Sequence, residues 1–322
     1  APARETPPAA RQPTESESGA VETALVEPGP AMNQAMAETT LVFATTQYAA
    51  TLTNRGGRIQ SWGLPEYAGI GGKQVDLVGA EPEVGIQLET PAGRVDLGET
   101  LFATREEILP DGGRRITFTA GLEGGAQIAK TYTLPAKGYM ADLDIAISGA
   151  EDAVGYRLTW SSSVPPAEKS AKLDQDATGA IALLGNQKET VKPGAFRRAP
   201  EKVLEGNVRW AGVRNKYFMA VMVPPEDATS RVVAVGDAAT GRAGAEIVMP
   251  LLRGAAADRF QLYLGPIDYD HLKDLGHNLD HAVELGWNIF RPISKALLWL
   301  MIWLHGFLPN YGVVIIIVSI LT

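Results

Sequence analysis

The feature that most limits the fold of this chain is a long succession of short segments rich in β-branched and aromatic residues between positions 41 and 265. Gly, Pro, Asn and Asp separate these segments, and 34 glycines and 21 prolines occur in all. Short segments of this kind, each ended by a turn signal, are typical of β-strands joined by tight turns. The strand candidates are 41–53, 58–64, 84–90, 101–108, 114–120, 126–134, 139–148, 154–162, 180–184, 208–213, 217–223, 231–235, 245–249 and 259–264. They predict a large antiparallel β-sandwich.

Two patterns support the strand assignment in detail. Asn54-Arg55-Gly56-Gly57 and Leu109-Pro110-Asp111-Gly112-Gly113 are turn signals that end one candidate strand and precede the next. In residues 139–148, Leu143, Ile145 and Ile147 alternate with Asp142 and Asp144. Such alternation predicts a strand with one buried face.

Composition excludes several kinds of protein. The net charge of −8 argues against nucleic-acid binding, and the absence of cysteine removes thiol catalysis and thiolate metal sites. All four histidines lie after residue 264, so the β region has no histidine base for a catalytic triad. His277 and His281 have helical spacing but no third ligand at a fixed distance, and Gly69–Lys73 lacks the Ser/Thr of a phosphate loop. We therefore predict no catalytic residue, no metal and no cofactor.

The two ends of the chain differ from the β region. Residues 1–40 contain six prolines, nine alanines, six glutamates and no aromatic residue, which predicts a flexible linker. Because the chain begins at Ala1 rather than Met, we expect it to be part of a longer protein. After the β domain of 41–265, apolar residues at helical spacing predict a packing helix over 266–283, weakened by Gly276 by about 1 kcal/mol.

The segment 284–308 predicts an amphipathic helix in the membrane interface. Tryptophan favours the lipid headgroup level, and basic side chains on one helix face can reach lipid phosphates. The residues assigned to this interface are Trp287, Phe290, Arg291, Lys295, Trp299 and Trp303. A core helix packed on the sandwich is the alternative. Residues 309–322 predict a turn and the truncated start of a transmembrane helix, since a complete span needs about 20 apolar residues.

Several motifs in the second half of the chain resemble the periplasmic domain of the YidC/Oxa/Alb family of membrane protein insertases. They are Trp210-Ala211-Gly212-Val213-Arg214-Asn215-Lys216-Tyr217-Phe218, Leu262-Tyr263-Leu264-Gly265-Pro266, Leu285-Gly286-Trp287, Pro292-Ile293-Ser294-Lys295, Asn310-Tyr311-Gly312 and Val314-Ile315-Ile316-Ile317. Tyr311 stands where the family usually has Trp. The family-motif residues carried over are Trp210, Gly212, Lys216, Tyr217, Phe218, Gly265, Pro266, Asn310 and Gly312.

This resemblance implies a mutarotase-like β-supersandwich followed by C-terminal helices, in a protein of the bacterial inner membrane with most of this chain in the periplasm. It implies insertion and folding of membrane proteins, alone or with the Sec translocon. The implied partners are the lipid bilayer, nascent membrane proteins and periplasmic accessory subunits of the SecD/SecF type, without nucleic acid. The arginine of the family's insertion groove would fall after Thr322.

Two other functions stay open at this point. One is a membrane-anchored carbohydrate-binding or carbohydrate-active sandwich, although the histidine that mutarotase chemistry usually needs is missing from the β region. The other is a periplasmic scaffold that binds partners along a sheet edge or cleft, which is compatible with the insertase.

Overall fold

The computed structural model describes residues 37–167, 177–226 and 228–283. The predicted linker 1–40 (apart from its last residues), the interface helix 284–308 and the segment 309–322 lie outside the described residues. The described residues form the mainly β architecture that the strand pattern predicts, with three sheets whose neighbouring strands all pair antiparallel.

The largest sheet has nine strands in the order β13-β12-β15-β16-β19-β10-β9-β8-β7. In chain order these are β7 (Ala103–Ile108), β8 (Arg114–Gly121), β9 (Gln127–Leu134), β10 (Met140–Ser148), β12 (Gly179–Leu184), β13 (Gln187–Val191), β15 (Val208–Arg214), β16 (Phe218–Val223) and β19 (Ala256–Pro266). The alternation predicted for 139–148 is confirmed, because Leu143, Ile145 and Ile147 of β10 are buried.

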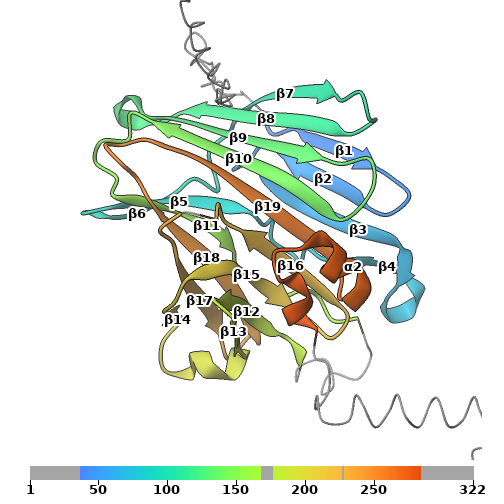
Figure 1. The fold of residues 1–322 in the computed structure, drawn as a ribbon. Helices are drawn as coiled ribbons and strands as arrows, with labels where there is room; N and C mark the ends of the chain where they lie inside the picture. The colour runs from blue at the N-terminus through green and yellow to red at the C-terminus, as the bar shows by residue number, and fades with distance from the viewer. Residues whose placement is uncertain (1–36, 168–176, 227, 284–322) are drawn as a thin grey trace, which may run out of the picture. The chain divides into compact units, whose positions relative to one another are not determined.

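Two smaller sheets complete the β architecture (Figure 1). The four-stranded sheet contains β1 (Thr40–Ala44), β2 (Ala49–Thr53), β3 (Arg58–Ala68) and β4 (Gln74–Asp76) in that order. The six-stranded sheet has the order β14-β17-β18-β11-β5-β6, with β5 (Gly85–Thr90), β6 (Gly93–Asp96), β11 (Gly155–Trp160), β14 (Glu201–Leu204), β17 (Arg231–Asp237) and β18 (Arg242–Pro250). The candidate strand 41–53 is therefore a hairpin of two strands rather than one strand.

Contacts between the sheets make one continuous core. The indole Nε1 of Trp62 on β3 donates to the carbonyl of Leu264 on β19 at 3.0 Å, and the Tyr48 hydroxyl donates to the carbonyl of Pro135 at 2.6 Å. These bonds join the four-stranded to the nine-stranded sheet. On the other side of the domain, β12 and β15 pack against β17 and β18 of the six-stranded sheet. The Tyr48 and Trp62 rings stack with centroids 4.4 Å apart.

The six-stranded sheet is strongly curved. Its edge strands β6 and β14 would lie about 24 Å apart in a flat sheet, given a spacing of about 4.8 Å between strands. Nevertheless Arg94 of β6 and Glu201 of β14 form a bidentate ion pair, with N–O distances of 2.6 and 3.0 Å. The two edges therefore approach each other across the face that is turned away from the nine-stranded sheet, and both lie on the left in Figure 1.

The segment after β19 corrects the prediction of one helix over 266–283. The structure has a short helix α2 (Tyr269–Leu275) and a 3₁₀ turn η4 (Leu279–Ala282). Gly276, at φ +78°, ends α2, and the next two residues also have positive φ. The apolar residues that predicted the helix do pack against the sandwich, because Leu272 and Leu279 are fully buried. Within the described ranges, no helix is long and apolar enough to cross a bilayer.

Three further 3₁₀ turns lie in the connections between strands. They are η1 (Ile70–Gly72), η2 (Glu123–Gly125) and η3 (Pro193–Arg197). Gly71 in η1 has φ +73° and nothing within 4 Å of where a Cβ would be, so Gly69–Lys73 is an exposed surface loop.

Candidate functional site

The motif residues within the described ranges lie on three adjacent strands. Trp210 and Gly212 are on β15, Phe218 begins β16, and Gly265 and Pro266 end β19. Because β16 pairs with β15 on one side and with β19 on the other, Phe218 lies opposite Pro266. Lys216 and Tyr217 occupy the turn between β15 and β16. The structure thus brings seven predicted motif residues together, next to the point where the chain enters α2.

Asn215, inside this motif, holds the β15–β16 turn in shape. Its Oδ1 accepts hydrogen bonds from the backbone N–H groups of Tyr217 and Phe218, at 2.9 and 2.8 Å. Its Nδ2 donates to the carbonyl of Pro165 at 2.9 Å, and the residue is fully buried. Because this buried amide bonds to both segments, it connects the turn to the segment after β11.

Three hydrogen bonds tie the C-terminal helices to the sheet. The Arg214 guanidinium donates through Nη1 to the carbonyl of Ala282 in η4 at 2.9 Å. The Trp210 indole N–H donates to the carbonyl of Asn278, just before η4, at 3.3 Å. At the start of the helical segment, the N–H of Ile267 donates to the carbonyl of Tyr217 at 2.7 Å. We call Trp210, Arg214, Asn215 and Tyr217 with these partners the junction cluster.

The two glycines of the motif are required for close packing. A Cβ on Gly212 would lie 2.0 Å from the carbonyl oxygen of Ala220 on the neighbouring strand. A Cβ on Gly265 would lie 2.8 Å from Cγ of Tyr139 and 3.0 Å from the hydroxyl of Tyr263. Neither glycine has a positive φ, so the lack of space, rather than backbone conformation, selects glycine here.

Aromatic rings surround the end of β19 and the start of α2. Tyr139 lies edge-on to His271 with centroids 5.7 Å apart, and the Tyr263 hydroxyl donates to the carbonyl of Pro266 at 2.6 Å. Phe218 contacts Tyr67 of β3 in a T-shaped pair at 5.2 Å. Burial raises the pKa of Tyr139 to about 12 and that of Tyr263 above its usual value, so these two phenols stay neutral and act as hydrogen-bonding and packing groups.

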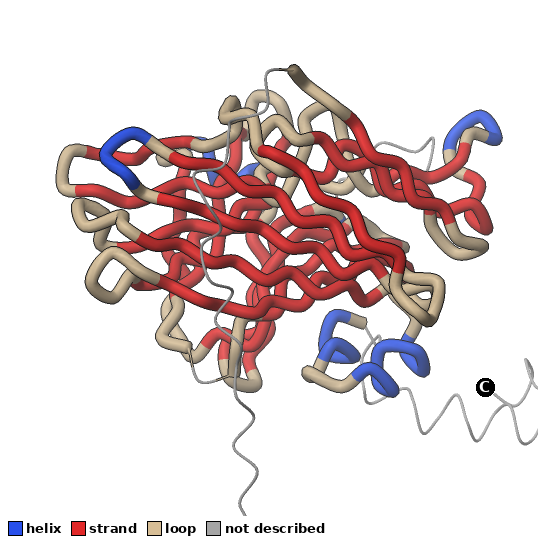
Figure 2. Tube along the Cα trace, turned by 90° about the horizontal axis from the view of Figure 1, so that it is seen from above, coloured by secondary structure: helices blue, strands red, loops and turns tan. Residues whose placement is uncertain are grey.

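Figure 2 shows α2 and η4 beside one end of the strands. His277 and Asn278, which connect them, both have left-handed backbones, with φ +53° and +56°. A surface pocket of about 210 Å³ adjoins this connection. Its lining residues are Val208, Arg209, Val223, Pro224, Glu226, His277 and Asn278.

Glu83 and Lys130 are two of the buried ionisable groups that lie away from the junction cluster. Glu83 is 1% exposed; its carboxylate accepts from the N–H groups and hydroxyls of Ser161 and Ser162, and burial raises its pKa to about 7. The Lys130 amine donates to the carbonyls of Val84 and Gly56 at 2.6 and 3.2 Å, and burial holds its pKa well below the usual value. Each group is satisfied by structural partners, as expected for residues that hold the sheets together.

Several predicted residues cannot be placed in this arrangement. The interface residues Trp287, Phe290, Arg291, Lys295, Trp299 and Trp303, and the motif residues Asn310 and Gly312, lie outside the described residues. The described ranges contain no group of three His, Asp or Glu residues that could hold a metal ion. Arg214 and Asn215, by contrast, belong to the site; they lie within the motif 210–218 but are not among the motif residues predicted to be functional.

Replacing Arg214 with methionine is expected to loosen η4 without unfolding the sandwich. The variant loses the donor to the Ala282 carbonyl, a change worth about 1–3 kcal/mol for a buried group. Hydrogen exchange of the amides of Leu279, His281 and Val283 should therefore become at least about tenfold faster. Arg105→Met, at an exposed position of the edge strand β7 and away from η4, is the control. Equal exchange in both variants would contradict the role of Arg214.

Comparison with known proteins places this geometry in a family. The family profile described as YidC periplasmic domain matches residues 40–300. Among curated proteins, the membrane protein insertase YidC of Chlorobium limicola is 26% identical over 292 residues, covering 85% of this chain and 50% of that protein. The YidC of Anaeromyxobacter dehalogenans is 29% identical over 313 residues, covering 88% of this chain and 54% of that protein. The chain spans about half the length of the curated relatives it matches.

Solved structures similar to this chain include a galactose mutarotase-like protein from Lactobacillus casei. It is 10% identical, with a TM-score of 0.47, and the match covers 71% of this chain and 100% of that one. The profile match includes β1 to η4 and hence the whole junction cluster. On this match, the chain belongs to the YidC family of membrane protein insertases and contains its periplasmic domain.

Proposed function

We propose that this chain is part of a membrane protein insertase and that its β domain is a scaffold and partner-binding module of that machine. The observation that carries the proposal is the match of residues 40–300 to the YidC periplasmic domain, together with insertase relatives that cover most of the chain. On this proposal the domain lies in the periplasm of a bacterium with its protein anchored in the inner membrane. The clients are nascent membrane proteins.

Insertion of a membrane protein needs no covalent chemistry. A charged side chain at the bilayer centre costs about 2.5–3.5 kcal/mol on insertion scales, so a protein that offers a hydrated path lowers this barrier. The client's own apolar helix then supplies the driving force. We accordingly propose a non-enzymatic activity, and the family match favours it over the carbohydrate-active alternative.

The junction cluster gives the domain a mechanical role in this proposal. Arg214, Trp210 and Tyr217 form hydrogen bonds to both ends of the 267–283 segment, and these bonds attach α2 and η4 to the sandwich. The chain continues from η4 into 284–308, for which we propose a place in the membrane interface with Trp287, Phe290, Arg291, Lys295, Trp299 and Trp303 at headgroup depth. The junction cluster would then determine the orientation of the β domain relative to the membrane surface.

We also propose two kinds of partner besides the lipid. One is the Sec translocon with periplasmic accessory subunits of the SecD/SecF type, which would meet the domain outside the membrane. The other is the emerging client itself. The described residues carry exposed sheet edges on which either could bind, and backbone pairing at an edge is a common way of recognising extended chains.

The proposal is tested by replacement in cells. A chimera in which this chain replaces the matching half of a curated YidC relative is expected to restore growth and client insertion in a strain depleted of its own insertase. Insertion is measured by protease protection of a radiolabelled single-span client. The same relative with this half deleted is the control, and it shows whether client insertion requires this half at all. Normal expression and membrane location of the chimera without client insertion would contradict the proposal.

A further inference from the structure

Among the residues that the structure describes, the backbone groups on the outer edge of β1 have no hydrogen-bonding partner. At the two ends of the β1–β2 pairing, the N–H of Asn54 donates to the carbonyl of Thr39 at 3.0 Å, and the N–H of Thr45 donates to the carbonyl of Tyr48 at 2.8 Å. In an antiparallel pair, alternate residues bond to the partner strand, so the odd-numbered residues of β1 face β2. The residues whose N–H and C=O groups point away from the sheet are Thr40, Val42 and Ala44.

Strand β1 also lacks the charges that protect the other sheet edges. Among the described strands, the remaining edges are β4, β6, β7, β13 and β14. Each carries at least one charged side chain, which discourages pairing with a further strand. These side chains belong to Asp76, Arg94, Asp96, Arg105, Glu106, Glu107, Lys188, Glu189, Glu201 and Lys202. β1 reads Thr-Leu-Val-Phe-Ala, and Val42 is 69% exposed on its outer face.

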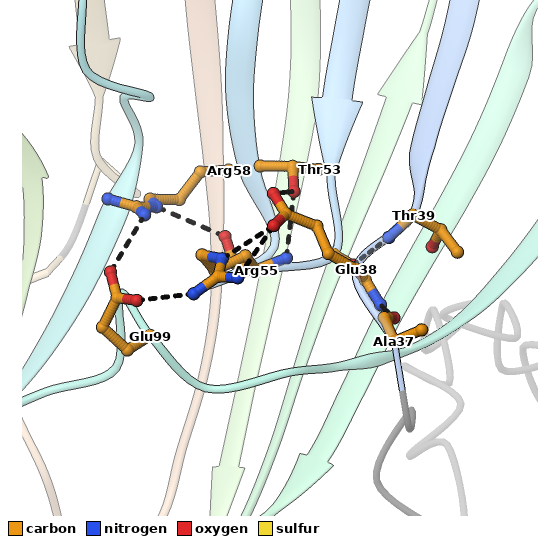
Figure 3. A network of polar contacts seen from close by, with 8 residues as sticks. Ala37, Glu38, Thr39, Thr53, Arg55, Arg58 and Glu99 are labelled. Atoms are coloured by element: carbon orange, nitrogen blue, oxygen red, sulfur yellow. Dashed lines mark hydrogen bonds and ion pairs between the residues drawn. The ribbon is translucent and has the colours of Figure 1, made fainter.

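The polar network in Figure 3 fixes the start of β1. Glu38 forms a salt bridge with Arg55 at 2.8 Å, and Arg55 forms a second one with Glu99 at 2.8 Å. The buried side chain of Asn54 accepts from the N–H of Thr39 at 2.7 Å and donates to the carbonyl of Ala37 at 3.1 Å. Residues 37–39 are therefore attached to Asn54 by hydrogen bonds before the strand begins.

The end and the inner face of β1 are fixed as well. The Thr45 hydroxyl accepts from the N–H groups of Gln47 and Tyr48 at 3.1 and 3.0 Å, which closes the hairpin. On the inner face Phe43 is buried, with the Arg114 guanidinium 5.6 Å from its ring centroid. An edge strand held in this way loses little conformational entropy when another strand pairs with it.

We propose that β1 is a docking edge for an extended segment of another polypeptide, with uncharged side chains and apolar residues at alternate positions. The unpaired N–H and C=O groups are complementary to the backbone of a further strand, and Val42 offers its side chain an apolar neighbour. This inference rests on the proposed function, because it names the emerging client as the polypeptide. Client segments of a membrane protein have this uncharged, apolar chemistry.

The test measures binding of a short fluorescein-labelled peptide of alternating valine and threonine, with lysine at both ends, to the full chain in detergent solution. Val42→Pro removes one outward N–H and is tolerated at a sheet edge, so binding should weaken at least about tenfold. Glu106→Pro makes the same change at an outward position of the charged edge β7 and should leave binding unchanged. Thermal unfolding confirms that both variants are folded.

A second probe does not depend on how the variants fold. The same peptide with every backbone nitrogen methylated keeps its side chains but has no N–H donors, and it is expected not to bind. Equal binding of the methylated peptide, or of the unmodified peptide to folded Val42→Pro, would overturn the proposal. So would sedimentation showing that β1 pairs with a second copy of the chain, with no peptide binding. If the unmodified chain does not bind the peptide but supports client insertion, the docking edge alone is refuted. If it binds the peptide but does not support client insertion, the proposed function alone is refuted.

Discussion

Gly212→Ala is expected to destabilise the domain by about 4 kcal/mol or more, an effect at the upper end for a single substitution. The added Cβ would lie 2.0 Å from the carbonyl oxygen of Ala220 and 2.6 Å from Cα of Val221. Both atoms belong to the backbone of β16, so no side-chain rotation can make room. Either β15 and β16 separate locally or the Asn215 turn is displaced, and in both cases the junction cluster is disrupted.

The matched control is Gly121→Ala at the end of β8, in the same nine-stranded sheet. Gly121 has an ordinary φ and nothing within 4 Å of the added Cβ. Alanine there is expected to change stability by less than about 1 kcal/mol, because it only reduces the freedom of the unfolded chain. Urea unfolding followed by tryptophan fluorescence compares the two variants. Similar midpoints would show that the close approach of β15 and β16 is not needed.

The strand pattern predicted the central strands well and missed strands at the margins. Four strands were not predicted: β4, β6, β13 and β14. Each of them is the outermost strand of its sheet. An edge strand is held through backbone bonds to one neighbour and need not bury a whole face, so Gly-Arg-Val-Asp of β6, exposed throughout, carries no apolar alternation. Alternating apolar residues indicate a strand with a buried face, whereas these edge strands are held by backbone hydrogen bonds to one neighbour.

The division of 266–283 into α2 and η4 has a similar origin. Apolar spacing continues across Gly276, and Leu272 and Leu279 on either side are both buried. Periodicity alone therefore does not distinguish one helix from two short helical segments that bury the same residues. The positive φ angles of Gly276, His277 and Asn278 end the helix, and the sequence contains only the glycine as a signal for it.

The residues of the junction site could be predicted only in part from the sequence. The motif residues were selected by resemblance, and the structure shows them on adjacent strands. The roles of Arg214 and Asn215, which lie within that motif, were not predicted because their partners include main-chain carbonyls, of Ala282 and Pro165, which lie 68 and 50 residues away in the chain. A carbonyl has no residue identity, so no spacing of side chains reveals such a bond before the fold is known.

Arg157→Met is expected to destabilise the domain by about 3–5 kcal/mol, the cost of leaving a buried charge without its partner. The Arg157 guanidinium lies 2.7 Å from Glu89 and 2.5 Å from Glu246, and its side chain is 6% exposed. Glu246 is nearly as buried, at 7%. Without Arg157, the Glu246 carboxylate would keep the full cost of its burial and lose the charge that compensates for it.

The loss of stability expected for Arg157→Met depends on pH, and the pKa of Glu246 determines whether the loss grows or shrinks as the pH rises. Burial already raises the pKa of Glu246 above its usual value, while Arg157 lowers it, so removing Arg157 raises the pKa further. A carboxyl with a raised folded-state pKa contributes its stability below the unfolded-state value, and this contribution is lost as pH rises through the folded-state pKa. The free energy of unfolding of Arg157→Met should therefore be closest to that of the unmodified chain near pH 4.5, and the difference between the two should be largest near pH 8. Urea unfolding of both proteins at each pH measures this difference.

The double variant Arg157→Met/Glu246→Leu distinguishes charge burial from loss of packing. Replacing both members of a buried ion pair by apolar residues of similar volume is often neutral or stabilising. The double variant is accordingly expected to recover most of the lost stability and to lose the pH dependence of the single variant. If it were as unstable as Arg157→Met at every pH, Glu246 would not be the cause. The contacts of Arg157 with Glu89, and with Glu201 at 3.9 Å, would then hold the curved sheet together.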